Sequence, residues 1–251
     1  MKSLFKTCMM SFALFGSLLL PAMQSHAGML AVFGDVNSMN DNTAGRNKLL
    51  SNLLGSGTRV LESKQNTDFP AAAPFSTYYN TVAGVKATAS SADITSALLN
   101  NYDLLFLNIG CCGGAWSNPY STTEIQAMAG FLQNGGTIGI LEEPCCTDTA
   151  AVNGMNAMLA SLGSTMRYTN WVDNGGTATI LPSLLSTGIT GYAPNTFGVI
   201  TGGVAVAQVA GYTAVAYEIV GATKAVPEPA SLALLGLGLA GLGIVRHKKR
   251  G

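Results

Sequence analysis

The sequence predicts one α/β domain built on a doubly wound, mostly parallel sheet, with a β-rich C-terminal part and a separate C-terminal hydrophobic helix. Residues 102–146 carry the first observation, because two apolar runs of strand length flank an amphipathic helix, as in a βαβ unit. The two runs are apolar on both faces, which is typical of parallel strands that helices cover above and below. Strand-like and helical patterns also alternate from residue 29 to residue 162, which favours a single α/β sheet.

The central unit has clear element boundaries. Its strands are expected at residues 104–109, where Asn108 is the one polar residue, and at residues 137–141. Between them, Ser121 and Glu124 have the spacing of a capping box, in which each side chain bonds to the backbone N–H of the other residue. Asn134 and the two glycines after it predict the end of the helix in a left-handed cap. Because such crossovers are right-handed and short, the two strands are expected to be neighbours.

The remaining elements follow from local patterns. Before the central unit we expect strands at residues 29–34 and 58–61 and helices ending at Leu54 and Asn100, with Asp41 or Asn42, and Ser91 or Asp93, as their caps. Residues 36–42 and 65–80 are expected to be loops. After it we expect a helix capped by Thr147 or Asp148, and then short strands at residues 166–170, 178–181, 197–200, 204–209 and 214–220.

The N-terminal residues 1–27 have the composition of a secretory signal peptide. Lys2 and Lys6 precede an apolar run at residues 8–20, and Ser25-His26-Ala27 supplies small residues at the −3 and −1 positions of a cleavage site before Gly28. The alternative is a retained anchor, although the apolar run is short for a membrane span. We therefore expect secretion across the inner membrane and processing by signal peptidase.

The C-terminal residues 225–251 have three parts. Val226, Pro227, Glu228 and Pro229 come first, residues 232–245 are rich in Leu and Gly, and residues 246–250 are basic apart from one histidine. This order closely resembles the PEP-CTERM sorting signal of Gram-negative bacteria that make exopolysaccharide. The resemblance implies a transient transmembrane helix, processing by an exosortase, and delivery to the cell surface or matrix. The alternative is a plain C-terminal anchor, with the basic tail on the cytoplasmic side.

The net charge of zero conceals an acidic domain. Six of the 13 Lys and Arg residues lie in the two terminal signals, so residues 28–229 carry seven basic and thirteen acidic residues, a net of −6. An acidic surface does not suit a polyanion, so no nucleic-acid partner is expected. Residues 28–224 have a normal length for one globular domain.

The layout of strands, Gly-rich loop and helix also resembles class I glutamine amidotransferase-like and flavodoxin-like domains. Gly110-Cys111-Cys112-Gly113-Gly114 contains the nucleophile pattern Gly-x-Cys-x-Gly of the amidotransferases, but residues 115–120 separate it from the helix that should follow directly. By layout, the family's nucleophile would fall at Glu142 and Glu143. The only histidines are His26 and His247, both in terminal signals. Because a cysteine nucleophile normally needs a neighbouring base, an amidotransferase-type active site is not expected.

Four cysteines remain in the mature chain, and a pair of them follows each central strand. In an oxidising compartment they favour a disulfide framework, with Cys111 and Cys112 bonded to Cys145 and Cys146. Vicinal disulfides within each pair are the alternative. A zinc site with four thiolates is a third interpretation, although neither pair has Cys-x-x-Cys spacing.

Acidic residues follow the same strand ends. Asp35, Glu142, Glu143 and Asp148 are expected at or near the carboxyl edge of the sheet, where α/β sheets bind ligands. They suit a Ca²⁺ site, a carboxylate pair acting on a glycan, or simply solvated loop residues and helix caps. Three aromatic residues suit either a sugar-stacking surface or the core: Trp116, Tyr120 and Trp171.

The sequence therefore predicts an exported binding or structural protein linked to exopolysaccharide, with no catalytic residues and no resident cofactor other than an optional Ca²⁺. The alternative is an extracytoplasmic hydrolase that acts on polysaccharide through carboxylates at the same edge.

Overall fold

A computed structural model describes residues 27–41, 43–65, 67, 75–111, 120–143, 149–173 and 175–221. The elements up to the central helix are β1 (Gly28–Phe33), α2 (Val36–Asn40), α3 (Ala44–Leu54), β2 (Arg59–Ser63), α4 (Phe75–Tyr79), β3 (Lys86–Ser90), α5 (Ser96–Leu99), β4 (Leu104–Cys111) and α6 (Thr122–Gln133). The elements after it are β5 (Thr137–Glu143), α7 (Thr149–Ser161), β6 (Arg167–Val172), β7 (Thr179–Ile180), β8 (Phe197–Thr201), β9 (Val204–Val209) and β10 (Tyr212–Val220).

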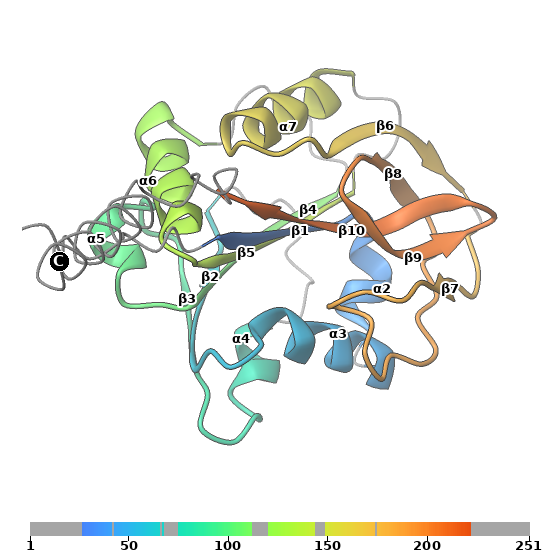
Figure 1. Cartoon of the computed structure of the whole chain (residues 1–251), viewed down its shortest axis with the longest axis horizontal. Helices are drawn as coiled ribbons and strands as arrows, with labels where there is room; N and C mark the ends of the chain where they lie inside the picture. The colour runs from blue at the N-terminus through green and yellow to red at the C-terminus, as the bar shows by residue number, and fades with distance from the viewer. Residues whose placement is uncertain are drawn as a thin grey trace, which may run out of the picture.

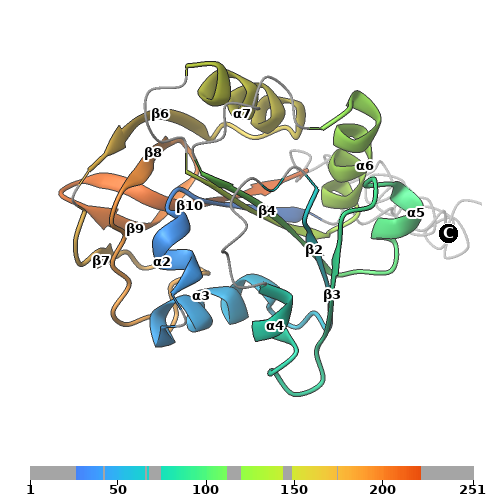
Figure 2. The same ribbon diagram turned by 180° about the vertical axis from the view of Figure 1, so that it is seen from behind.

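One large sheet organises the domain. Its strand order is β3-β2-β4-β5-β1-β10-β9-β7, in which β3 to β1 are parallel and β10, β9 and β7 are antiparallel additions. A second sheet pairs β6 with β8. Helices α5, α6 and α7 lie on one face of the large sheet and α2, α3 and α4 on the other, as Figures 1 and 2 show from opposite sides. The α/β class, the mostly parallel sheet and the β-rich C-terminal part are therefore confirmed.

The strand order differs from the flavodoxin order 2-1-3-4-5 in one respect. Strands β2, β3, β4 and β5 have the relative positions of the first four flavodoxin strands, but β1 occupies the fifth position, beside β5. The first described strand thus lies in the middle of the large sheet, where β1 pairs with β5 on one side and with β10 on the other.

The central unit matches the prediction closely. Leu104 pairs with Thr137 and Leu107 with Ile140, so β4 and β5 are parallel neighbours. Ser121 caps α6, with both hydrogen bonds of the capping box present. After α6, Gly135 has a φ of 86°, the left-handed conformation that glycine adopts at low cost.

Four local predictions are wrong, and one strand was not predicted. Residues 36–42 and 65–80, expected as loops, contain the short helices α2 and α4, and β3 was not foreseen. Thr43 caps α3 in place of Asp41 or Asn42, and Thr95 caps α5 in place of Ser91 or Asp93. The reason is that α2 and α4 are five residues long, too short for periodicity, and are held by tertiary contacts.

Two apolar layers fill the space between the sheet and its helices. On the α6–α7 face, Leu105, Leu107 and Ile140 pack against helix residues such as Met128 and Met158. On the α2–α4 face, Phe106 lies against Phe33 and Phe75, with ring centroids 5.9 and 4.2 Å apart. Alternate residues of each strand therefore face different helix layers, which decides the partners of every polar side chain at the strand ends.

Candidate functional site

The carboxyl ends of four neighbouring strands carry polar side chains on the α2–α4 face. Glu62 of β2, Asn108 of β4, Glu143 of β5 and Asp35, just after β1, are each at most 3% exposed. The strands lie in the order β2, β4, β5, β1, so these four side chains form a row across the sheet, which we call the acid row. Three buried carboxylates in one row are costly unless each is hydrogen-bonded or protonated.

Asp35 and Glu143 form one end of the acid row. Phe33 pairs with Leu141 in parallel register, so Asp35 and Glu143, each two residues further on, come to the same level on the same face. Glu143 Oε2 accepts a hydrogen bond from Val36 N (3.0 Å), and Asp35 Oδ2 accepts one from Asn195 N (2.6 Å). The pair thus ties the start of α2 and the segment before β8 to the end of the sheet.

Burial raises the pKa of Glu143 to about 7, and the negative charges of Asp35 and Asp173 add to the effect. The hydrogen bond from Val36 opposes it only in part, because it favours the ionised form. The Glu143 carboxyl therefore titrates near neutral pH.

Glu62 and Asn108 form the other end, and sequence reasoning did not select either as a site residue. Asn108 Nδ2 donates to Glu62 Oε1 (2.9 Å), Ser76 N donates to Glu62 Oε2 (2.8 Å), and the Lys64 ammonium lies 3.4 Å from Glu62 Oε1. Asn108 Oδ1 is buried and accepts no hydrogen bond in the described part of the chain. The available signal was the presence of an amide in an otherwise apolar strand.

Glu142 lies on the opposite face of the sheet from Glu143, because successive strand residues alternate. Its backbone oxygen accepts a hydrogen bond from Tyr168 Oη (2.9 Å), and Tyr168 belongs to the apolar layer on the α6–α7 side. The four predicted edge acids are therefore divided. Asp35 and Glu143 come together, Glu142 points the other way, and Asp148 lies outside the described residues.

The predicted metal and sulfur sites are only partly described. Within the described ranges no group of three or more His, Cys, Asp or Glu side chains is placed to hold a metal ion, and Ca²⁺ stays an untested prediction. Cys112, Cys145 and Cys146 lie outside the described residues, as does the side chain of Cys111. The backbone of Cys111 pairs with Glu143, two residues before Cys145, so the two cysteine pairs do follow adjacent strand ends.

The candidate aromatic surface is not assembled by the residues that are described. Tyr120 is 1% exposed and belongs to the core on the α6–α7 side, where its hydroxyl donates to the backbone oxygen of Gln65 (3.4 Å). Trp171 lies on β6 and is partly exposed, and Trp116 lies outside the described residues. Tyr120 is therefore a core residue.

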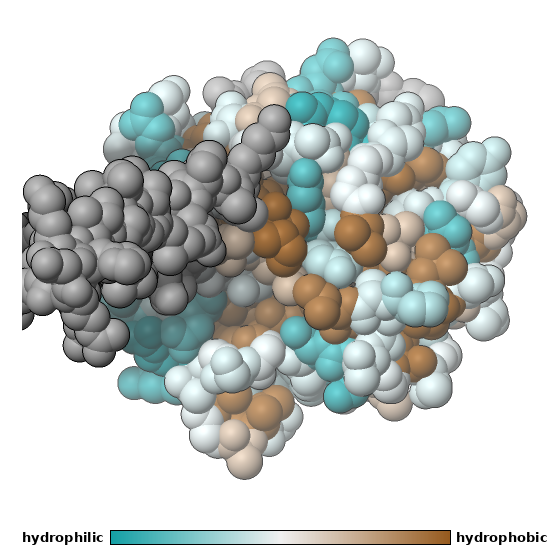
Figure 3. All heavy atoms as spheres, in the orientation of Figure 1, coloured by the Kyte–Doolittle hydropathy of each residue, from teal (hydrophilic) through white to brown (hydrophobic). Residues whose placement is uncertain are grey.

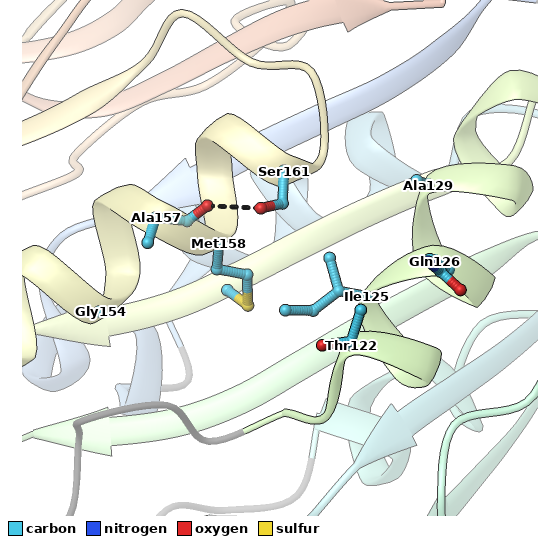
Figure 4. A pocket seen from close by; sticks show the side chains of 8 residues that line it. All are labelled: Thr122, Ile125, Gln126, Ala129, Gly154, Ala157, Met158 and Ser161. Carbon is cyan, nitrogen blue, oxygen red and sulfur yellow. Dashed lines mark hydrogen bonds between the residues drawn. The ribbon is translucent and has the colours of Figure 1, made fainter.

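Two hollows lined by described residues lie away from the acid row. A groove of about 470 Å³ runs between α6 and α7, where Ile125 and Met158 approach each other and Ala129, Gly154 and Ala157 leave space (Figure 4). A second hollow of about 280 Å³ lies near the amino ends of the parallel strands. Among the coloured residues of Figure 3, apolar side chains occur in several separate groups and not as one broad patch.

Comparisons with known proteins add one specific finding. Residues 225–249 match the PEP-CTERM protein-sorting motif. This motif implies export, a C-terminal membrane anchor and processing by an exosortase. No helix in the described ranges is long and apolar enough to cross a membrane, and the motif itself lies outside those ranges.

No curated protein matches the chain. Among solved structures it is similar to the IMPa metallopeptidase from Pseudomonas aeruginosa (18% identity, TM-score 0.36, 54% of this chain and 15% of that one). It is also similar to a peptidase from an acI-B1 Actinobacterium (12% identity, TM-score 0.29, 47% of this chain and 55% of that one). A third similar structure is MppP soaked with the product 2-ketoarginine (16% identity, TM-score 0.36, 79% of this chain and 48% of that one). The chain spans at most about half the length of these proteins. These weak similarities do not confirm a glutamine amidotransferase-like core.

Proposed function

We propose that this protein is exported to the cell surface or extracellular matrix, where it has a binding or structural role linked to exopolysaccharide. The sorting motif at residues 225–249 carries this proposal, because an exosortase substrate leaves the cytoplasm and passes through a membrane-anchored stage. The acidic stretch of residues 28–229, with its net charge of −6, suits a neutral or cation-bearing glycan better than a polyanion.

The hydrogen bonds of the acid row support a structural, non-catalytic role for its carboxylates. Asp35 and Glu143 each accept a backbone N–H from a segment that folds over the strand ends, and Glu62 does the same for α4. Such bonds replace the water that a buried carboxylate loses. Residues 28–224 also contain no histidine to act as a general base for a cysteine or serine nucleophile.

Disulfides across the carboxyl edge are part of the proposal. The pairing of Cys111 with Glu143 in the β4–β5 register brings the chain next to Cys112 close to the chain before Cys145. Two bonds here would close loops of roughly 35 residues, worth about 3 to 4 kcal/mol each in the loop-entropy model. Peptide mapping without reductant tests this, and free thiols in the exported protein would contradict it.

The second candidate is a polysaccharide hydrolase that uses Asp35 and Glu143. One observation favours it: two carboxyl groups lie on the same face of neighbouring strands, and burial raises the pKa of one of them to about 7. An acid and a base with separated pKa values are what glycoside hydrolysis needs. Glu142 cannot be the partner of Glu143 in this reaction, because it lies on the other face.

Two experiments test the proposed function. Deleting the host's exosortase should leave the chain in the membrane fraction with its C-terminus intact, and unchanged release would overturn the sorting role. The purified mature domain should then bind the host's exopolysaccharide without releasing reducing ends. Reducing ends that disappear in Glu143→Gln and Asp35→Asn, but persist in Glu142→Gln on the opposite face, would establish the hydrolase instead.

A further inference from the structure

Both ends of the domain lie at one edge of the large sheet. Gly28, the first residue of β1, pairs with Val220, the last residue of β10, in the antiparallel register of these neighbouring strands. The next residue, Gly221, adjoins the end of α6, since a Cβ built on it would lie 3.4 Å from the Cα of Gln133. The amino ends of β1 to β5 share this edge, which we call the amino edge. It is opposite the acid row (Figures 1 and 2).

The segment between the domain and the apolar part of the sorting signal is short. Ten residues, 222–231, separate Gly221 from Leu232, where the apolar part of the signal begins. A flexible chain of this length has an average span of roughly 18 Å and a fully extended limit of about 35 Å. The acid row is about 20 Å beyond the amino edge, at the far end of strands that rise about 3.3 Å per residue. Turning that far end toward the bilayer would therefore require the tether to run about 20 Å back along the domain, at least its average span, whereas an amino edge that faces the bilayer requires no such run.

Charge separates the two edges in the same sense. The carboxyl ends of β1, β2 and β5 carry four acidic residues and one basic residue: Asp35, Glu62, Glu142, Glu143 and Lys64. The amino edge carries Arg59 and Lys86 at the starts of β2 and β3, Asp103, whose carboxylate is paired with Arg59 at 2.5 Å, and Glu218 near the end of β10. The carboxyl edge is therefore net negative even when Glu143 is protonated, whereas the charges of the amino edge balance, so an anionic bilayer repels the carboxyl edge more.

The surface of the amino edge suits a lipid headgroup layer. The hollow of about 280 Å³ at this edge is lined by Arg59, Asn100 and Asn134 among others, and it adjoins Gly136, next to the first strand. Amide and guanidinium groups donate hydrogen bonds to the phosphate and ester oxygens of headgroups.

We propose that, while the sorting segment anchors the chain, the amino edge faces the bilayer and the acid row faces away from it. The proposal rests on the sorting role proposed above and adds an orientation to it. The anchored domain would then present its carboxyl edge to the matrix before an exosortase acts, with the predicted signal-peptidase site before Gly28 on the membrane side.

The test uses the full chain after signal-peptide removal, reconstituted in vesicles of phosphatidylethanolamine with a minority of phosphatidylglycerol. A photo-crosslinking benzoylphenylalanine is placed either at Thr123 or at Asn134, exposed positions at opposite ends of α6. Lipid adducts should form several-fold more at Asn134. Equal labelling, reversed labelling, or no labelling at either position would overturn the orientation.

A second pair of labelling positions controls for a local effect of the substitution at Thr123 or Asn134. Lys86 and Ser91 are exposed and flank the start and end of β3, so the same preference is expected for the amino-end position, Lys86. Inserting about 20 flexible residues after Gly221 should weaken the preference at both pairs, because the tether then spans the domain. An undiminished preference would overturn the role of the tether.

Flotation of the vesicles distinguishes this proposal from the one on which it rests. If the chain does not float with the vesicles, the membrane-anchored stage itself is wrong. If it floats but shows no preference between Asn134 and Thr123, only the orientation is wrong.

Discussion

Replacing Glu143 by glutamine should remove a pH-dependent loss of stability from the domain. Burial raises the pKa of this carboxyl from 4.5 to about 7 in the folded domain. Between these values the unfolded chain gives up a proton that the folded domain keeps, so folding becomes less favourable as the pH rises. The gap between the two pKa values is equivalent to about 3 kcal/mol. The free energy of unfolding is lower by this amount above pH 7, and the loss is absent below pH 4.5.

A glutamine side chain at this position has the shape of the protonated acid and does not ionise. Its side-chain oxygen can accept the hydrogen bond that Val36 N donates to Glu143, so the substitution keeps that contact. Below pH 4.5 we expect Glu143→Gln to differ little from wild type in its free energy of unfolding. At pH 8 the variant should be more stable by up to about 3 kcal/mol.

Urea unfolding of residues 28–224 at a series of pH values from 4.5 to 8, followed by circular dichroism, measures this difference. Glu142→Gln is the matched control, because it removes a carboxylate from the adjacent residue on the opposite face of β5. If the curves of Glu143→Gln and wild type stay parallel across this range, the buried carboxyl does not hold a proton in the folded state. The raised pKa of Glu143 is then wrong.

Three further perturbations probe other parts of the fold. The hydrogen bond from Arg59 is the chief cause that lowers the pKa of Asp103 to about 2, so this carboxylate should stabilise the domain above pH 4 and lose the effect as the pH falls toward 2. Asp103→Asn should therefore destabilise the domain at pH 7 but not at pH 2, as measured by thermal unfolding. An equal loss of stability at both pH values would contradict the ion pair. A Cβ on Gly34 would lie 2.3 Å from the backbone oxygen of Gly198, so Gly34→Ala should lower the free energy of unfolding by about 1 to 3 kcal/mol. At Gly84 a Cβ meets no atom within 4 Å but the φ is 79°, so Gly84→Ala measures the cost of backbone strain alone in the same assay. Phe106→Ala should cost about 3 to 5 kcal/mol in urea unfolding, and a loss below about 1 kcal/mol would mean that its contacts with the neighbouring rings contribute little.

The central βαβ unit was predictable because its signals are local. A capping box, a glycine that adopts a left-handed conformation and two strands apolar on both faces each depend on a few consecutive residues. The same reasoning placed Cys111 and Glu143 on neighbouring strand ends, and the β4–β5 register confirms it. The sorting signal was predictable for a similar reason, since composition and order alone define it.

The candidate site was only half predictable. Asp35 and Glu143 were expected at the carboxyl edge because both follow apolar strands, but nothing in the sequence indicated that β1 inserts beside β5 and brings the two carboxyls together. Glu142 and Glu143 look equivalent in sequence, and only the alternation of β5 between two helix layers separates them. Asn108 becomes the hydrogen-bond partner of Glu62 only because β2 pairs with β4, and the sequence did not indicate this pairing.

The sequence by itself determined the C-terminal sorting signal, the α/β class and the parallel pair at the centre of the sheet. Those features depend on composition, periodicity and short-range hydrogen bonds. The tertiary structure alone decided that β1 lies in the middle of the sheet, that both ends of the described domain lie at the amino edge, and that three carboxylates are buried in one row at the opposite edge. Apolar strands of similar length are interchangeable in their local preferences, so their order is set by long-range packing, and the order then fixes which charges meet.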